Sequence, residues 1–306
     1  MGQSKIIKQL LWNKIIGNEE IQELLKQTIK SERASHSYLF IGTEGIGKKQ
    51  IAKEFAKALL CIEENKYCGK CKSCIEFDNN NNPDFILIEP EESSIKIDQI
   101  REIQRKVVEK PIISRQKVYI IDDSDKMTPE AQNGLLKTLE EPPEYITIIL
   151  IGSNENSFLS TIKSRCTILR FKDIKQEKIE KYLEEQGIYF KDKKILKACS
   201  GSIGKALQVK DKQEEYENIQ DFIQNIKQKD IIEIFQKAEF IYNSKEEIQN
   251  ILQYINILLL ELAKENYKYA ECVEIVENTK KRLQSYSNYD MTIDNMLMQI
   301  KEKIKQ

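Results

Sequence analysis

The stretch SYLFIGTEGIGKKQIAKEF, residues 37–55, joins a short apolar run to an amphipathic segment through a glycine-rich loop. The apolar run predicts a buried strand, and the spacing of Ile51 and Phe55 predicts a helix that begins directly after the loop. A phosphate-binding loop requires this setting, because backbone N–H groups at a helix N-terminus point at phosphate oxygens. A glycine-rich turn with a purely structural role is the alternative. The candidate phosphate-binding residues are Gly42, Gly45, Gly47, Lys48 and Lys49.

The loop departs from the usual pattern at its last position. Lys48 is expected to reach the β- and γ-phosphate oxygens, but Lys49 stands where the motif has the Ser or Thr hydroxyl that ligates Mg²⁺. The run VYIIDD predicts another strand, ending in Asp122, the usual Mg²⁺ partner. Asp123 follows where active ATPases carry the longer Glu, which orients the attacking water. We therefore expect a nucleotide cradle without metal chemistry; nucleotide binding stays open, and hydrolysis is not expected.

The first half of the chain alternates apolar runs with amphipathic segments. Further runs at 85–88, 118–121 and 147–152 predict buried strands separated by helices, which is typical of a parallel α/β sheet. Beyond the last proline, Pro143, helical patterning prevails. It predicts a small helical unit over 173–209 and three to five amphipathic helices over 211–306, including one at 247–264. Residues 79–82 predict a surface loop before the Pro83–Asp84 turn.

Charge and hydropathy exclude several classes of protein. The 48 Lys and Arg residues against 49 Asp and Glu residues leave a net charge of -1, so no overall positive field draws the chain to DNA or anionic membranes. No run approaches the roughly 20 apolar residues of a membrane helix, and the first residues lack a signal-peptide pattern. We expect a cytoplasmic protein without a membrane partner.

Four of the seven cysteines form one cluster, just after the helix that follows the phosphate loop. They are Cys61, Cys68, Cys71 and Cys74, in the pattern C-x6-C-x2-C-x2-C. Cytosolic thiols stay reduced, and four thiolates suit tetrahedral zinc, so the spacing predicts a structural zinc site with no open position for water. An iron–sulfur cluster is the alternative. Cys199, Cys272 and His36 are interpreted as structural residues.

Several segments together resemble one family. They are ASHSYLF at 34–40, the cysteine cluster, NPD at 82–84, SIKIDQIR at 94–101, AQNGLLKTLEEPP at 131–143 and SRC at 164–166. Over residues 11–207 the chain resembles the delta-prime family of bacterial DNA polymerase III clamp-loader subunits. The resemblance implies an AAA+ P-loop domain over 1–172 with a zinc insertion at 61–74. It also implies a helical lid over 173–210 and a helical collar over 211–306 that packs against other subunits.

The related tau/gamma motor subunits share the LEEPP and SRC stretches, so those stretches do not separate the two kinds of subunit. The resemblance implies that a motor has Ser or Thr in place of Lys49, Glu in place of Asp123 and Arg in place of Gly204. Lys205, next to Gly204, could substitute in part for that second-sensor arginine. The three changes favour a subunit that does not hydrolyse ATP.

The resemblance also implies a role for Arg165. In this family the arginine of SRC projects into a neighbour's ATP site, where it stabilises charge on the transferring γ-phosphoryl group. From the residues alone, a surface salt bridge or a helix C-terminal contact is the alternative. The implied partners are tau/gamma and delta subunits in a five-subunit ring that loads a sliding clamp on primed DNA. An active AAA+ ATPase and a zinc-dependent DNA-repair binding module are the alternative functions.

Overall fold

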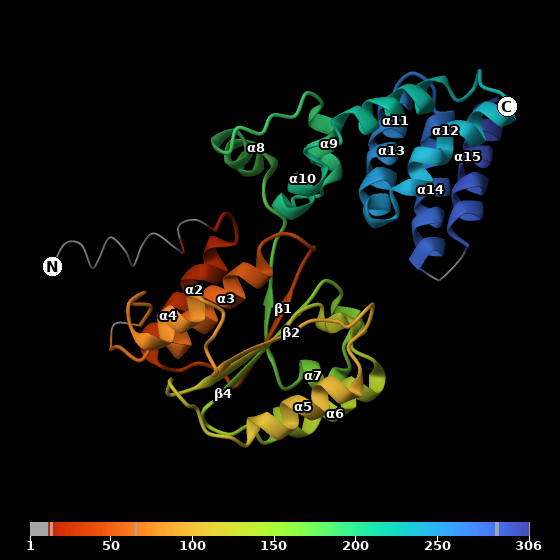
Figure 1. Ribbon diagram of the computed structural model, residues 1–306. Helices are drawn as coiled ribbons and strands as arrows, with labels where there is room; N and C mark the ends of the chain where they lie inside the picture. The colour runs from red at the N-terminus through yellow and green to blue at the C-terminus, as the bar shows by residue number, and fades with distance from the viewer. Residues whose placement is uncertain (1–11, 13–14, 65, 285–287, 306) are drawn as a thin grey trace. The chain divides into compact units, whose positions relative to one another are not determined.

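The computed structural model describes residues 12, 15–64, 66–284 and 288–305, and the chain divides into two compact units, 1–178 and 179–306. The first unit contains a five-stranded parallel sheet in the order β2-β3-β4-β1-β5 (Figure 1). Its strands are β1 (Ser37–Ile41), β2 (Phe85–Ile88), β3 (Lys117–Ile121), β4 (Ile146–Gly152) and β5 (Thr167–Arg170). Every residue of β1, β3 and β4 is buried, as their apolar runs predict for strands covered on both faces.

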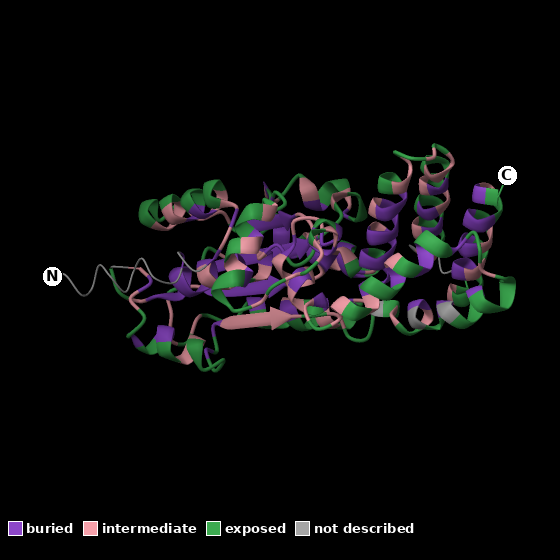
Figure 2. Ribbon diagram, turned by 90° about the horizontal axis from the view of Figure 1, so that it is seen from above, coloured by how far each residue is buried: buried purple, intermediate pink, exposed green. Residues whose placement is uncertain are grey.

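Helices cover both faces of this sheet. Figure 1 shows α2 (Glu19–Ser31), α3 (Lys48–Leu60) and α4 (Lys72–Asp78) on one side, with α5 (Ile97–Val107) and α6 (Pro129–Glu140) on the other. Successive strand side chains point to opposite faces. Within β1, Tyr38 therefore meets Phe55 of α3 with ring centroids 5.3 Å apart, whereas Leu39 joins the apolar cluster under α5 and α6. In Figure 2 the central strands are buried, and β2 at the sheet edge has intermediate burial.

The predicted strands and the α/β class are confirmed, with one strand missing from the prediction. The stretch AQNGLLKTLEEPP at 131–143 lies mostly in α6, which Thr128 caps by accepting the N–H of Ala131 and which ends before Pro142. Short turns, η2 (Ser124–Lys126), η3 (Glu155–Ser157) and α7 (Ser160–Lys163), complete the unit. The edge strand β5 was not predicted.

The second unit is helical. Its helices, counting α8 which spans the division, are α8 (Gln176–Glu185), α9 (Lys193–Ala198), α10 (Ile203–Val209), α11 (Gln213–Asn225), α12 (Ile231–Asn243), η4 (Lys245–Glu247), α13 (Ile248–Leu262), α14 (Lys268–Gln284) and α15 (Tyr289–Lys305). The helix expected at 247–264 is α13. Because the division falls inside α8, the boundaries at 172 and 210 stay predictions. Within the described residues, no helix is long and apolar enough to cross a membrane.

Candidate functional site

Three glycines shape the loop between β1 and α3. Gly45 and Gly47 have φ values of +76° and +92°, a left-handed conformation that residues with a side chain disfavour. At Gly42, a Cβ atom would lie 2.8 Å from the backbone oxygen of Phe171, which follows β5. The glycines therefore allow the loop to pack closely on the sheet and to turn into the N-terminus of α3.

Lys48, the first residue of α3, folds back onto this loop. Its Nζ donates to the carbonyl oxygens of Gly42, at 2.5 Å, and Thr43, at 2.8 Å. The residue is buried, and burial lowers the pKa of Lys48, although the nearby carboxylates of Asp125 and Asp122 act against this. A phosphate bound in the loop would therefore compete with two backbone carbonyls for this ammonium group.

Lys49 forms ion pairs with two acidic residues at the carboxyl edge of the sheet. Its Nζ lies 2.9 Å from Asp122 Oδ2 and 2.5 Å from Glu89 Oε1. Asp122 follows β3 and Glu89 follows the adjacent strand β2, so strand pairing brings the two carboxylates together. Burial tends to lower the pKa of Lys49, but the hydrogen bonds and charges of Asp122 and Glu89 outweigh it and raise this pKa. Lys49 is thus a protonated, fixed cation at neutral pH.

These contacts do not fit a Mg²⁺ ion held by this chain. Mg²⁺ demands oxygen ligands in near-octahedral geometry, whereas Lys49 offers none and Asp122 already faces an ammonium group. Two like unit charges 4 Å apart repel by about 4 kcal/mol at an effective dielectric constant of 20, and a divalent ion would double that figure. A divalent cation at the carboxylate of Asp122 would therefore have to displace the ammonium of Lys49.

The other acids of the segment after β3 also have internal partners. Asp123, where a motor has Glu, accepts from Lys126 Nζ at 2.8 Å. Asp125 accepts the backbone N–H groups of Ser153 and Asn154, at 3.0 and 3.1 Å, which connects this segment to the end of β4. Each of the three aspartates after β3 therefore makes a contact within the chain that a metal or a water molecule would have to replace.

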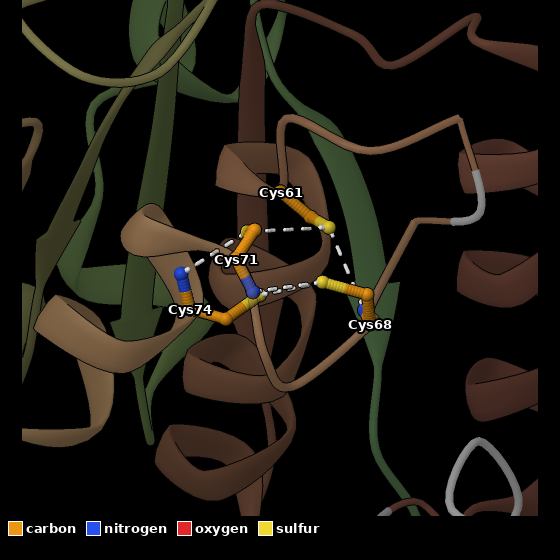
Figure 3. Close-up of side chains that lie close together, drawn as sticks. All are labelled: Cys61, Cys68, Cys71 and Cys74. Atoms are coloured by element: carbon orange, nitrogen blue, oxygen red, sulfur yellow. Dashed lines mark hydrogen bonds between the residues drawn. The ribbon is translucent and has the colours of Figure 1, made fainter. Parts of the chain in front are cut away.

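The four clustered thiols could hold a metal ion, and their geometry fits zinc. Their sulfur atoms all lie within 4.8 Å of one another (Figure 3). The Cys61–Cys71 and Cys68–Cys74 sulfur distances are 3.9 and 4.0 Å, close to the roughly 3.8 Å that Zn–S bonds of about 2.3 Å give in a tetrahedron. Zinc bound to all four thiolates would have no position for a substrate.

Backbone N–H groups favour the thiolate forms in this cluster. The N–H of Cys71 points at Cys68 Sγ at 3.2 Å, and that of Cys68 at Cys61 Sγ at 3.5 Å. The hydrogen bond from Cys74 lowers the pKa of Cys61 to about 5, and the same bond raises that of Cys74. Burial raises the pKa of Cys68, so the backbone N–H groups reduce the cost of the thiolate forms but do not offset it at every sulfur, and a bound metal would supply the rest.

The surface loop expected at residues 79–82 and the turn expected at Pro83–Asp84 both form, but two of their side chains are buried. Asn82 and Asp84 are buried, although residues 79–81 before them are exposed. The Asp84 carboxylate accepts the backbone N–H groups of residues 112, 113 and 114 at 2.7–2.8 Å. The amide of Asn82 donates to the carbonyl and hydroxyl oxygens of Ser73 in α4. These two side chains anchor the cysteine insertion to the sheet domain, because Ser73 also hydrogen-bonds Ser114 at 2.9 Å.

Arg165 lies between α7 and β5, and both its side chain and its backbone have partners. Its Nη2 is 2.7 Å from Glu140 Oε1 at the end of α6, and its Nη1 donates to the carbonyl oxygen of Thr161 at 2.9 Å. The backbone oxygen of Arg165 accepts from the Ser37 hydroxyl at 2.6 Å. The side chain keeps one third of its surface exposed, at 33%. In the single chain, Arg165 thus makes both contacts that were given as alternatives to the finger role, namely a salt bridge and a contact at a helix end.

Arg165 and the phosphate loop lie at opposite ends of parallel strands. Arg165 precedes β5, the loop follows β1, and the two strands pair with Tyr38 opposite Thr167. At about 3.3 Å per residue, the five residues of β1 separate the two sites by roughly 16 Å or more. Arg165 therefore does not serve the phosphate loop of its own chain.

Residues 17–175, which contain the phosphate loop, the cysteine cluster and Arg165, match the family model described as DNA polymerase III, delta subunit. The chain belongs to this family. As a member of the DNA polymerase III delta subunit family, it is a clamp-loader-type subunit whose first unit contains a five-stranded parallel sheet.

Relatives of this family member include two kinds of subunit. DNA polymerase III subunit delta' of Bacillus subtilis (strain 168) is 35% identical over 62% of this chain and 58% of its own length. DNA polymerase III subunit tau/gamma of Haemophilus influenzae is 36% identical over 64% of this chain and 30% of its own length. The chain thus matches less than two thirds of either protein, and the similarity does not separate delta' from tau/gamma.

Among solved structures, the clamp-loader family member is similar to a DNA polymerase III gamma subunit-related protein from Thermotoga maritima. The sequence identity is 20%, the similarity covers 93% of this chain and 99% of that chain, and the TM-score is 0.48.

The predicted second-sensor position lies in the helical unit. Gly204 and Lys205 are in the first turn of α10, where the hydroxyl of Ser202 caps the helix by accepting the Lys205 N–H at 3.1 Å. Gly204 has no side chain that could replace the second-sensor arginine, and Lys205 is the adjacent basic residue in the sequence.

Proposed function

We propose that this chain is a delta-prime-type stator of a clamp loader, which supplies Arg165 to the ATP site of a neighbouring motor subunit. The observation that carries the proposal is the placement of Arg165, partly exposed and at the opposite end of the strands from its own phosphate loop. A guanidinium there is too far from the phosphate loop of its own chain to contact a γ-phosphate, but in the proposal it contacts that of another subunit, where it would stabilise the charge that develops during phosphoryl transfer. The family membership supports the assembly.

Glu140 is the resting partner of this arginine finger. Both side chains are partly exposed, at 33% and 48%, so their ion pair contributes about 1 kcal/mol or less to stability. A γ-phosphate carries more negative charge than one carboxylate and offers the same bidentate geometry to a guanidinium. Exchange of Glu140 for a neighbour's phosphate is therefore favourable once the subunits assemble.

The chain itself does not hydrolyse ATP in this proposal. Lys49 supplies no metal ligand and neutralises Asp122, and Asp123 is both shorter than the expected Glu and paired with Lys126. Hydrolysis would need a metal ion and an oriented water molecule at these residues. The alternative, an active tau/gamma-like ATPase, requires that both ion pairs break during turnover.

The remaining parts of the proposal concern partners and zinc. The partners are tau/gamma and delta subunits in a five-subunit ring, with the sliding clamp and primed DNA reached through the ring. The second unit is the collar that joins these subunits, and zinc at Cys61, Cys68, Cys71 and Cys74 is structural. The net charge of -1 supports DNA contact through the complex rather than by this chain alone.

The experiment is ATP hydrolysis by the cognate motor and delta subunits, with clamp and primed DNA, in the presence of this chain or its variants. We expect Arg165→Ala to assemble normally but to lose hydrolysis at the adjacent site, since arginine fingers accelerate NTPases by on the order of 10³–10⁵ at one site. The matched control is Arg170→Ala, an exposed arginine in β5 whose partner is Glu155 at 2.8 Å. It should support hydrolysis as the wild type does.

Two outcomes would contradict the stator. If the assembled complex with Arg165→Ala hydrolysed ATP at the wild-type rate, Arg165 would not be an arginine finger. If the isolated chain hydrolysed ATP, the chain would be a motor subunit. Tight, salt-sensitive DNA binding by the isolated chain, with no effect on partner hydrolysis, would favour the zinc-dependent DNA-binding module instead.

A further inference from the structure

The residues Lys49, Asp122 and Glu89 form a cation triad, a name used below for these three side chains. We propose that the Lys49 ammonium replaces the divalent cation of this site, so that the phosphate loop binds a nucleoside triphosphate without Mg²⁺. The proposal rests on the proposed function in one respect, namely that the chain does not hydrolyse the nucleotide.

The first support is the position of the ammonium. Lys49 is the second residue of α3, where an ATPase has its Mg²⁺-binding hydroxyl, and its longer side chain reaches the carboxylate that would face the metal. The Asp122 side chain is only 16% exposed, so a second cation has little access to it. Lys49 thus stands at the motif position of the Mg²⁺-binding residue, and its ammonium lies beside the carboxylate that would face Mg²⁺ in an ATPase.

The second support is that two strands hold the ammonium. Glu89 and Asp122 follow paired strands, and the Asp122 N–H donates to the carbonyl oxygen of Ile88 at 2.9 Å, which fixes the distance between the acids. If Mg²⁺ displaced Lys49, Glu89 would lose its partner at 2.5 Å and the ammonium would face a divalent ion. Displacement is therefore opposed both by the lost ion pairs and by repulsion between the cations.

The third support is a phosphate cradle that does not depend on the metal. No acceptor among the described residues takes a hydrogen bond from the backbone N–H groups of Gly45, Gly47 and Lys48. Lys48 adds a buried ammonium beside them. In a motor, Mg²⁺ also screens the phosphates from the aspartate after β3. Here Lys49 already screens Asp122, so phosphate binding needs no added cation for that purpose.

The test is ATP binding to the full chain by titration calorimetry, in Mg²⁺ buffer and in EDTA buffer. For the wild type we expect dissociation constants that differ by less than about twofold between the buffers. Lys49→Thr restores the hydroxyl and frees Asp122, so its affinity should become at least about tenfold higher in Mg²⁺ than in EDTA, a difference that this method resolves.

Three further variants make the result specific. Lys53→Thr, one turn along α3, removes the same charge away from the cation triad and should bind ATP equally in both buffers, as the wild type does. Lys48→Ala should lose binding in both buffers, which shows that ATP occupies this loop. Lys49→Met removes the charge without adding a ligand, and should also gain a Mg²⁺ response through Asp122 if Lys49→Thr does not fold.

Two results would overturn the inference. One is a tenfold or greater Mg²⁺ enhancement of wild-type ATP binding; the other is no ATP binding in either buffer by a chain that is folded by circular dichroism. Neither result changes the Arg165→Ala experiment, which measures hydrolysis by the partner subunits. Conversely, wild-type hydrolysis with Arg165→Ala leaves the Mg²⁺ comparison intact, whereas ATP hydrolysis by the isolated chain would contradict both proposals.

Discussion

At the scale of single residues, the buried carboxylate of Asp84 has a stabilising role that its neighbours in the sequence do not indicate. It accepts three backbone N–H groups from the segment before β3 and has no exposed surface. The Asn-Pro-Asp sequence predicts a turn and also fits the family resemblance. It does not indicate burial, because the N–H groups that donate to the Asp84 carboxylate are about 30 residues away in the chain.

We predict that Asp84→Ala lowers the free energy of unfolding of the first unit by about 3 kcal/mol, since three buried N–H groups lose a charged acceptor. Urea denaturation followed by circular dichroism measures the change. The control Asp98→Ala removes an exposed carboxylate from a pair with Arg101 and should cost less than about 1 kcal/mol. Equal effects of the two substitutions would show that the Asp84 contacts are not stabilising.

The ion pairs of Lys49 show what sequence can and cannot predict at a site. The motif itself predicts that position 49 lacks a metal ligand. It does not predict Glu89 as a partner, because that contact exists only if β2 lies beside β3, and sequence patterns do not give strand order. The same holds for Arg165, whose contact with Glu140 depends on where α6 and α7 end.

At the scale of elements, buried strands were predictable because each of β1, β3 and β4 contains a run of four apolar residues, YLFI, VYII and IILI. The strand β5 was not, because in Thr167–Arg170 only the two middle residues are apolar and both end residues are exposed. A four-residue edge strand of this kind forms only because Tyr38 to Ile41 offer it a complete row of backbone partners.

The cysteine insertion gives a prediction at the same scale. Removal of zinc by a chelator should abolish amide protection in α4 and in the loop that begins at Cys61, while the sheet keeps its protection. Zinc ligation is worth roughly 10–16 kcal/mol in small zinc-finger peptides, far more than this short segment gains from its own packing. Hydrogen exchange measured by mass spectrometry distinguishes the two regions.

Metal analysis supplies the matched control for this prediction. The wild type should carry one zinc per chain, Cys68→Ser should lose it, and Cys166→Ser, outside the cluster, should retain it. Iron with visible absorbance would instead support the iron–sulfur alternative.

At the scale of the whole molecule, the two compact units have separate cores. The first is built from the sheet and its covering helices, and the second from helices, with large buried side chains such as Tyr216 and Tyr254 packed edge to face at 5.0 Å. We predict two calorimetric transitions on heating, and a chelator should lower only the transition of the first unit. One transition whose calorimetric and van't Hoff enthalpies agree would contradict this separation.

The strand order has a consequence for folding of the chain during its synthesis on the ribosome. The interior strand β1 is translated early, but both of its neighbours, β4 and β5, are translated later. The hydrogen bond from Ser37 to Arg165 joins residues separated by 128 positions. At a translation rate of roughly 5–20 residues per second, β5 is synthesised about 6 to 26 s after β1. During that interval the backbone edges and apolar side chains of β1 are unpaired, so the nascent chain should be a substrate for ribosome-associated chaperones until β5 emerges.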